Sequence, residues 1–186
     1  SNSFNDNIRD SIKGGTFNPY DKGFVSGNRN AASTLRRGIA GSVPHYQIND
    51  AKEACWAFEP TQAVNYCEAH DNNTLWDKLC ISAKNDSEGV RIKMDKLAAA
   101  IVILSQGMPF IQLGQDFLRS KPRILKEGEA PNDVNIYSHD SYNAPDYTNS
   151  IKWNRKLEYK EVFEYYKALI RLRKGSPLFR MYTKED

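Results

Sequence analysis

The sequence has few cysteines, no long apolar run and no concentration of charge of one sign. The three cysteines are Cys55, Cys67 and Cys80. Their odd number and the lack of C-x-x-C spacing argue against a disulfide framework and against a zinc site, so no metal is predicted. Cys67 lies within a strand pattern and Cys80 at the end of an apolar helical turn, so we predict that these two are buried free thiols. The longest apolar stretch, residues 97–104, is too short to cross a bilayer, so no membrane partner is predicted.

The charge balance also excludes a class of partner. There are 26 basic and 23 acidic residues, a net charge of +3, and no run of Lys and Arg. A protein that binds nucleic acid usually carries a basic patch, so no nucleic-acid partner is predicted. The chain does not begin with Met and shows no signal-peptide pattern, so the sequence predicts no compartment.

What is present is the composition of a globular domain. Hydrophobic residues make up 40% of the 186 residues and charged residues 26%. That length is sufficient for one domain with a sizeable core.

Three strand-like segments alternate with helical patterns. The segments are residues 3–7, 63–69 and 110–113, and each is followed by polar residues. Apolar residues at helical spacing predict long helices over 90–106 and 159–174. This alternation predicts α/β architecture built from parallel βα units.

Polar residues that follow parallel strands meet at one edge of a sheet. In a (β/α)8 barrel that edge carries the active site. Three βα units cannot close an eight-stranded barrel, so the sequence leaves two possibilities: a small open sheet, or part of a barrel.

Longer stretches of the sequence resemble pullulanases, the starch-debranching members of the α-amylase superfamily (glycoside hydrolase family 13). The stretches, in the order in which the family has them, are SFNDNIRDSIKG (3–14), KGFVSG (22–27), NYCEAHDNNTLWDKL (65–79), RIKMDKLAAAIVILSQGMPFIQLGQDFLRSK (91–121), SYNAPDYTNSIKWNRK (141–156) and VFEYYKALIRLRKGSPLFRM (162–181). Together they cover nearly the whole chain, which is more specific than any single motif.

The resemblance implies a fold. Residues 1–186 would be a partial glycoside hydrolase catalytic domain, the C-terminal portion of a (β/α)8 TIM barrel. Residues 3–7 would be barrel strand six, 63–70 strand seven and 110–114 strand eight.

The resemblance also implies an activity. The complete enzyme would cleave α-1,6-glucosidic bonds in pullulan, amylopectin or glycogen with retention, so the implied partner is an α-glucan. Asp71 would stabilise the transition state by holding the 2- and 3-hydroxyls of the sugar, and His70 would contact the same ring. The nucleophilic aspartate and the acid/base glutamate would precede Ser1, so the isolated chain is expected to be inactive. No cofactor is implied, and calcium dependence of a complete enzyme cannot be read from these residues.

Each candidate site residue also has a structural interpretation. Asp71 could cap a helix that starts near Asn73 or Thr74. Trp76 could stack on a sugar or pack in the core. Asn143 and Asp146 could bind a neighbouring glucose or form a turn around the proline between them.

Residues 119–150 form a long predicted loop on the active-site side. Loops of this length in a compact domain are usually functional or disordered. Residues 122–140 replace what is usually a short connection in the family. They could alter the donor subsites or be disordered.

Two other functions stay open. The chain could be a non-catalytic carbohydrate-binding or interaction module derived from the barrel. It could also come from another enzyme of the superfamily, such as an isoamylase or an α-1,4-amylase. In every case a partial barrel leaves strand edges open, so we predict self-association or pairing with the missing half-barrel.

Overall fold

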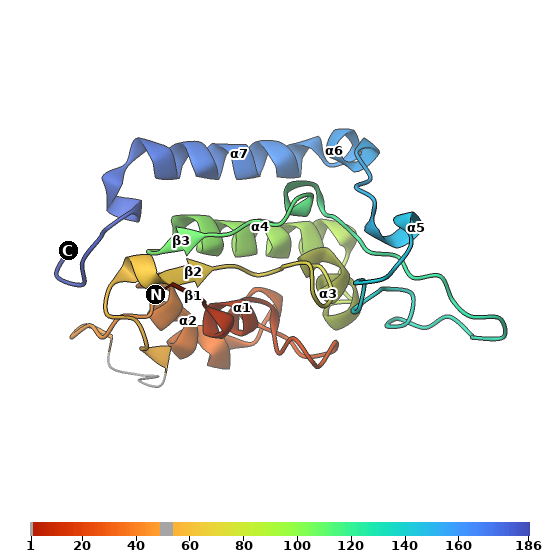
Figure 1. Cartoon of the computed structure of the whole chain (residues 1–186), viewed down its shortest axis with the longest axis horizontal. Coiled ribbons are helices and arrows are strands. Elements are labelled where there is room, and N and C mark those ends of the chain that lie inside the picture. Colours follow the sequence, from red (N-terminus) through yellow and green to blue (C-terminus); the bar gives the residue numbers. More distant parts are fainter. Residues whose placement is uncertain (1, 49–53) are drawn as a thin grey trace.

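Three short parallel strands form the centre of the fold (Figure 1), in a computed structural model that describes residues 2–48 and 54–186. The strands are β1 (Ser3–Phe4), β2 (Ala63–Asn65) and β3 (Met108–Pro109). Their order in the sheet is β1-β2-β3, and Val64 of β2 is in register with Phe4 on one side and Met108 on the other. Because the strands are parallel, their carboxyl ends meet at one edge of the sheet.

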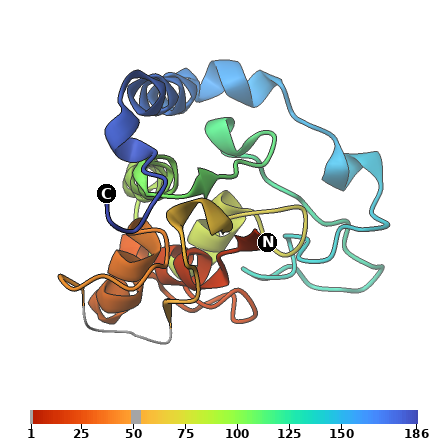
Figure 2. The same cartoon turned by 60° about the vertical axis from the view of Figure 1, so that its left-hand side comes forward.

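The helices follow the strands in sequence. They are α1 (Asp6–Lys13), α2 (Ala32–Ile39), α3 (Leu75–Ser82), α4 (Glu88–Leu104), α5 (Asp146–Asn149), α6 (Asn154–Glu158) and α7 (Lys160–Gly175). Helices α2, α4 and α7 lie next to one another along one side of the sheet (Figure 2), and α4 packs against both of the others. None of the helices in the described part of the chain is long and apolar enough to span a membrane.

Side-chain caps explain where three of these helices begin. The Asn5 side chain accepts a hydrogen bond from Ile8 N at the start of α1, Thr74 from Asp77 N at α3, and Ser87 from Val90 N at α4. Asn, Thr and Ser are preferred at this position because their oxygens satisfy a backbone N–H that the helix leaves unpaired.

The core lies between the sheet and this layer of helices. One cluster joins α1, α2, α3 and α4, and it contains Ile8, Ile12, Val25, Leu35, Cys67, Leu75, Leu79, Ala98 and Val102. A second cluster joins α3, α4 and α7, and it contains Trp76, Ile92, Ala99, Ile103, Leu118, Val162, Tyr166 and Leu169. The buried stripes of α4 and α7 therefore meet each other, as the helical spacing predicts.

A buried arginine joins α7 to the segment between α4 and β3. Arg173 is 8% exposed, and its guanidinium donates to Ile103 O, Ser105 O and Gly107 O. Gly107 has φ +104°, and a Cβ there would lie 2.7 Å from Ala63 O of β2. Only glycine suits this backbone conformation and this close approach.

The opposite face of the sheet carries apolar side chains that are partly exposed. The ring of Phe4, 51% exposed, contacts Tyr66 at 5.0 Å and Phe110 at 5.4 Å between centroids, in edge-to-face geometry. Phe4, Tyr66 and Phe110 form what we call the aromatic face, in which Tyr66 is buried and Phe4 is the most exposed ring.

The predicted α/β alternation is confirmed, and the predicted helices over 90–106 and 159–174 match α4 and α7 within two residues. The predicted strand over 110–113 is wrong: β3 is Met108–Pro109, and Phe110 N adds one further bond, to Asn65 O. Pro109 lacks an N–H and therefore donates nothing to the ladder. The strand predicted over 63–69 is also too long, because the ladder ends at Asn65.

The long loop of residues 119–150 lies at the carboxyl ends of the strands, on the right in Figure 1. Residues 122–140 within it fold back on themselves. Pro122 pairs with Tyr137, and Arg123 forms an ion pair with Glu129 at 2.7 Å. This segment therefore has internal contacts of its own in the structure, in contrast to the alternative that it is disordered.

Candidate functional site

His70 and Asp71 lie together just beyond the end of β2. His70 Nδ1 is 3.0 Å from Asp71 Oδ1, and the two side chains are 85% and 76% exposed. A surface pair of this kind contributes little to stability. Its exposure at the carboxyl edge of the sheet leaves both groups able to contact a ligand.

Asp71 does not cap the following helix, so that structural interpretation is wrong. Thr74 Oγ1 accepts from Asp77 N at 3.0 Å, and the buried Glu68 carboxylate accepts from Leu75 N at 2.7 Å. These two residues satisfy N–H groups at the first turn of α3. Asp71 is therefore not needed to cap α3.

Lys121 holds the backbone on both sides of Asp71. Its side chain is fully buried, and Nζ donates to His70 O at 3.0 Å and to Asn72 O at 2.5 Å. Asn72 has φ +62°, a conformation that costs energy for a residue other than glycine. Burial lowers the pKa of Lys121, and the ammonium donates to three acceptors: His70 O, Asn72 O and Ser141 Oγ.

Lys121 is itself fixed by α3. Its backbone N donates to Asp77 Oδ2 at 2.8 Å, and Ser120 Oγ donates to Asp77 Oδ1 at 2.5 Å. Burial raises the pKa of Asp77 to about 6 despite these hydrogen bonds. The loop that carries His70 and Asp71 is therefore tied to α3 through buried contacts.

Glu68 is a second buried group beneath the same loop. Burial raises its pKa to about 7, against the effects of the Leu75 N–H and of Lys13. With its amide nitrogen turned toward Glu68, Gln112 donates to Glu68 Oε1 and accepts from His70 N at 3.2 Å. Sequence reasoning missed Glu68, Gln112 and Lys121, because nothing in their local pattern distinguishes them from surface polar residues.

The predicted sugar-stacking role of Trp76 finds no support in the structure. Trp76 is 6% exposed and belongs to the core cluster between α3, α4 and α7. Its ring lies 6.3 Å from that of Tyr159 and under the guanidinium of Arg91. A tryptophan buried on the helix side of the sheet is not accessible to a ligand at the carboxyl edge, so the structure places Trp76 in the core.

Asn143 and Asp146 are both exposed, on a segment that is attached to the His70 loop. Ser141 Oγ lies 3.4 Å from His70 O and 3.2 Å from Lys121 Nζ. Asn149 closes the turn, since its amide donates to Ser141 O and to Ala144 O. The structure brings this segment to the loop, although no contact joins Asn143 or Asp146 to His70 or Asp71 among the described residues.

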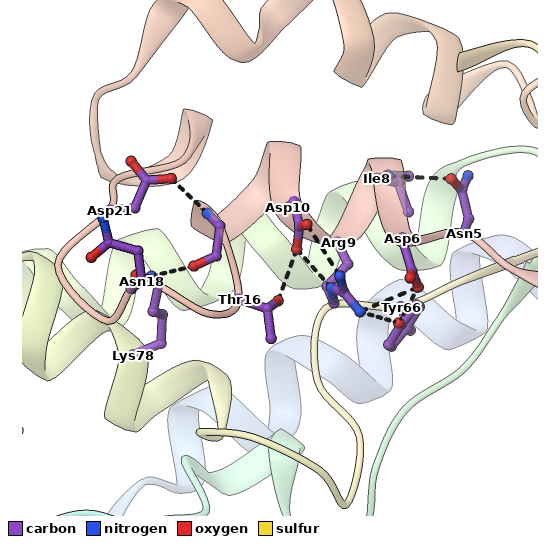
Figure 3. A network of polar contacts seen from close by, with 11 residues as sticks. Asn5, Asp6, Ile8, Arg9, Asp10, Thr16, Asn18, Asp21, Tyr66 and Lys78 are labelled. Carbon is purple, nitrogen blue, oxygen red and sulfur yellow. Dashed lines mark hydrogen bonds and ion pairs between the residues drawn. The ribbon is translucent and has the colours of Figure 1, made fainter. Parts of the chain in front are cut away.

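A polar network joins Asp6, Arg9 and Asp10 of α1 (Figure 3). Arg9 Nε lies 2.7 Å from Asp10 Oδ1, and the Arg9 Nη1 atom lies 3.2 Å from Asp6 Oδ1. Tyr66, which sequence reasoning did not include, donates to Asp6 and accepts from Arg9 at 2.7 Å, and burial raises its pKa to about 12. A small cavity beside this network is lined by Arg9, Tyr66 and Asp71.

No metal cluster of three or more His, Cys, Asp or Glu side chains occurs in residues 2–48 and 54–186. Cys67 is buried and its pKa is raised by burial, while Cys55 and Cys80 are half-buried. All three are free thiols, but the predicted burial holds for Cys67 and not for Cys80.

Comparison with known proteins gives matches to pullulanases and, at 21% identity over 187 residues, to isoamylase 3 of Oryza sativa subsp. japonica. The chain is 37% identical to the pullulanase of Bacillus subtilis strain 168 over 183 residues, 98% of this chain and 23% of that protein. The crystal structure of pullulanase type I from the same organism, complexed with maltose, superposes with a TM-score of 0.85 at 36% identity, over 100% of this chain and 23% of that one. A pullulanase from Paenibacillus barengoltzii in complex with maltohexaose and α-cyclodextrin has a TM-score of 0.82 at 38% identity, over 99% and 26% of the two chains.

Pullulanases are therefore homologous to this chain along nearly its whole length, in sequence and in structure. The chain spans about a quarter of the length of these relatives. No family model matches it.

Proposed function

We propose that this chain is the C-terminal part of the catalytic barrel of a starch-debranching glycoside hydrolase of the pullulanase type. Similarity to pullulanases along the whole chain carries the proposal. The three parallel strands, with helices on one side of the sheet, are consistent with approximately strands six to eight of a (β/α)8 barrel. The aromatic face of Phe4, Tyr66 and Phe110 would then point into the barrel.

In this proposal Asp71 stabilises the transition state and His70 grips the same sugar. Both are exposed beyond the end of the central strand, where Lys121 holds the backbone on either side. A carboxylate that binds the sugar hydroxyls more strongly as the ring flattens lowers the barrier rather than the ground state. Asn143 and Asp146 would contact the neighbouring glucose, on the segment that Ser141 attaches to this loop.

Retaining hydrolysis needs two further carboxyl groups, about 5–5.5 Å apart across the bond. We propose that parts of the protein outside this chain supply them, so that the isolated chain is inactive. The proposed substrate is an α-glucan with α-1,6 branches. Solved pullulanases that resemble this chain hold maltotetraose, maltohexaose or α-cyclodextrin, which supports that class of ligand.

The test is Asp71→Asn in the longer protein that contains this chain, with release of reducing sugar from pullulan as the readout. We expect kcat to fall by several orders of magnitude while the melting temperature is unchanged, because the lost interaction belongs to the transition state. Asp86→Asn, in the loop between α3 and α4, is the matched control and should keep full activity. A near-normal kcat for Asp71→Asn, or no hydrolysis by the parent protein, would favour a non-catalytic carbohydrate-binding module.

A further inference from the structure

The peptide group between Ala69 and His70 lies beyond the end of the strand ladder. Asn65 is the last residue of β2, and its carbonyl oxygen accepts a bond from Phe110 N, just past the end of β3. Beyond this bond, no strand in the described part of the chain pairs with the backbone that leads to His70. A backbone without ladder partners is mobile unless side chains take their place.

The side-chain amide of Gln112 holds this peptide group. With its nitrogen turned toward Glu68, the amide donates to Ala69 O at 2.7 Å, and its oxygen lies 3.2 Å from His70 N. Ala69 O and His70 N are the two polar atoms of one peptide group. Gln112 therefore supplies from a side chain the partners that the strand ladder no longer supplies.

Two charged side chains orient the Gln112 amide. Its nitrogen donates to Glu68 Oε1 at 3.1 Å, and its oxygen lies 3.2 Å from Arg119 Nη1. The buried Glu68 carboxylate is fixed by Leu75 N at 2.7 Å, and Arg119 Nη2 donates to Asn149 O at 3.0 Å. An amide has two donor hydrogens and two acceptor lone pairs, so these contacts and those to the peptide group use all of them. The hydrogen-bonding capacity of Gln112 is therefore spent on the protein itself.

The backbone of Gln112 is fixed by a tight turn. Gln115 N donates to Gln112 O at 3.0 Å, and Arg119 N donates to Gly114 O at 3.0 Å. Gly114 has φ +94°, and a Cβ at this position would lie 3.0 Å from Arg119 Cβ. Glycine suits this conformation and this close approach. The turn therefore presents the amide at a fixed place.

Gln112 and Lys121 hold His70 from opposite sides of its Cα. Gln112 contacts the peptide group before His70, and Lys121 Nζ donates to the carbonyl oxygen after it at 3.0 Å. The side chain itself is 85% exposed, so its place depends on this backbone. With both peptide groups fixed, the imidazole can move only by rotation about its own side-chain bonds.

We propose that Gln112 is a positioning residue for the reaction: by fixing the Ala69–His70 peptide group, its amide sets the place at which the imidazole of His70 meets the sugar. This inference rests on the proposed function, which assigns the sugar contact to His70. Gln112 acts through His70 and does not touch the substrate. A misplacement of about 1 Å in such a group can cost on the order of a hundredfold in rate.

Gln112→Glu, in the longer protein that contains this chain, tests the amide directly. The variant has the same shape, but an ionised carboxylate repels Ala69 O and Glu68, so kcat on pullulan should fall about tenfold to a hundredfold at about pH 8. When the new carboxyl group binds a proton, it regains a donor for Ala69 O and keeps an acceptor for His70 N. The ratio of kcat between variant and parent should therefore rise toward one as the pH falls from about 8 to about 5.

The charged groups around position 112 give the direction of this change. Glu68 faces the new carboxyl group from one side and Arg119 from the other. Lys13 of α1 and Asp77 of α3 act on Glu68 through their charges. Two carboxyl groups in contact cannot both ionise at low cost, so the variant takes up a proton as the pH falls, although Arg119 opposes this uptake. The exposed His70 is present in both proteins, so its own titration cancels in the ratio.

Gln106→Glu is the matched control. The Gln106 amide also holds backbone, since Nε2 donates to Leu178 O at 2.7 Å and Oε1 accepts from Met181 N at 2.9 Å. Gln106 precedes β3, so these contacts lie at the amino end of the sheet, away from His70. The same substitution therefore removes a contact of the same kind at another place. Its ratio of kcat to the parent should stay near one at every pH.

Gln112→Met provides a second readout that needs no substrate. Methionine keeps the length of the side chain and removes its donors and acceptor. We expect the His70 amide hydrogen to exchange about tenfold faster than in the parent, because the peptide group opens more often. Mass spectrometry with electron-transfer fragmentation measures the rate at this residue.

Four results would each overturn the proposal: an unchanged kcat for Gln112→Glu, a ratio that does not vary with pH, an equal pH response in Gln106→Glu, or unchanged exchange at His70 in Gln112→Met. A parent protein that hydrolyses no α-glucan would reject the proposed function and the positioning role with it. An active parent with an unaffected Gln112→Glu would reject only the role of Gln112.

Discussion

The ammonium group of Lys121 donates to the carbonyl oxygen of His70 at 3.0 Å, inside the protein and 51 positions away in the sequence. It also donates to Asn72 O, so that one buried lysine fixes both peptide groups that flank Asp71. Exposed side chains at a strand end are usually mobile, but here the Lys121 contacts fix the backbone that carries His70 and Asp71. The position of Asp71 therefore depends on a residue that does not touch the proposed substrate.

Lys121→Met tests this dependence, since methionine keeps most of the apolar stem and removes the donors. Two buried carbonyl groups would lose their partner, and we expect the free energy of unfolding to fall by roughly 2–4 kcal/mol. If the proposed role of Asp71 is right, kcat of the folded fraction should fall on the order of tenfold to a hundredfold, because the carboxylate is displaced. Urea denaturation and initial rates measure the two effects. Lys93→Met, on the exposed side of α4, should change neither, and an unaltered kcat for Lys121→Met would mean that Asp71 is placed by other contacts.

Glu68→Gln tests the buried carboxyl group beneath the loop. The pKa of Glu68 is raised from 4.5 to about 7 in the folded chain, so between these values the folded state binds more protons than the unfolded state. Its contribution to stability is therefore full below about pH 4.5 and is lost as the pH rises through about 7. Each unit of pKa difference corresponds to about 1.4 kcal/mol. We expect Glu68→Gln to flatten this decline in melting temperature between pH 5 and 7.

The matched control for this pH series is Glu127→Gln, at an exposed position of the 122–140 segment. It should leave the slope unchanged. Asp77, whose pKa is raised to about 6, contributes a decline of the same sign that remains in both variants. A steep decline that persists in full after Glu68→Gln would show that Glu68 is not its source.

Trp76→Ala separates a core residue from a sugar-binding residue. Because Trp76 is buried between α3, α4 and α7, we expect a loss of roughly 3–5 kcal/mol in the free energy of unfolding. Trp153→Ala is the comparison, since Trp153 is 58% exposed and should cost much less. If Trp76→Ala instead left stability intact and weakened glucan binding, the core assignment would be wrong.

The aromatic face of Phe4, Tyr66 and Phe110 leads to a prediction about the isolated 186-residue chain. Open strand edges and an uncovered apolar face favour association with another chain. We expect the chain to sediment as a concentration-dependent oligomer, or to require the rest of the barrel for a folded state. Phe4→Ser should shift the sedimentation toward monomer, whereas Phe58→Ser should not. A stable monomer that unfolds cooperatively at all concentrations would contradict the partial-barrel proposal.

Local sequence rules predict the helices of this protein well. Helices α4 and α7 carry continuous apolar stripes, so burial and helical period agree along their whole length. The same stripe placed Arg173 on the buried side of α7. The burial of Arg173 is explained by its hydrogen bonds to three carbonyl groups at the end of α4. Because these groups lie 66 to 70 positions earlier in the chain, local sequence cannot predict the contacts.

The strands and the site are less predictable. Alternation of apolar residues suggests long strands after residue 63 and after residue 110, but a strand lasts only as long as its neighbour pairs with it. Asn5 already caps α1, so β1 ends early and its ladder with β2 ends at the pair of Phe4 and Val64. Likewise His70 and Asp71 stand out as a motif, whereas Lys121 and Glu68 acquire their role only through tertiary contacts.

The way in which residues 122–140 are attached has a consequence for engineering. Ser138 N donates to Lys121 O at 2.8 Å, and Pro122 pairs with Tyr137, so the two ends of the segment are joined at its base. What lies beyond this base can change length at a small entropic cost. Replacing residues 124–135 with a short turn would leave the Lys121 contacts in place and remove Val134 from the cavity that it lines with Tyr137 and His139. The segment is thus a site where loop libraries could vary the surface beside His70 and Asp71 without changing the core of the fold.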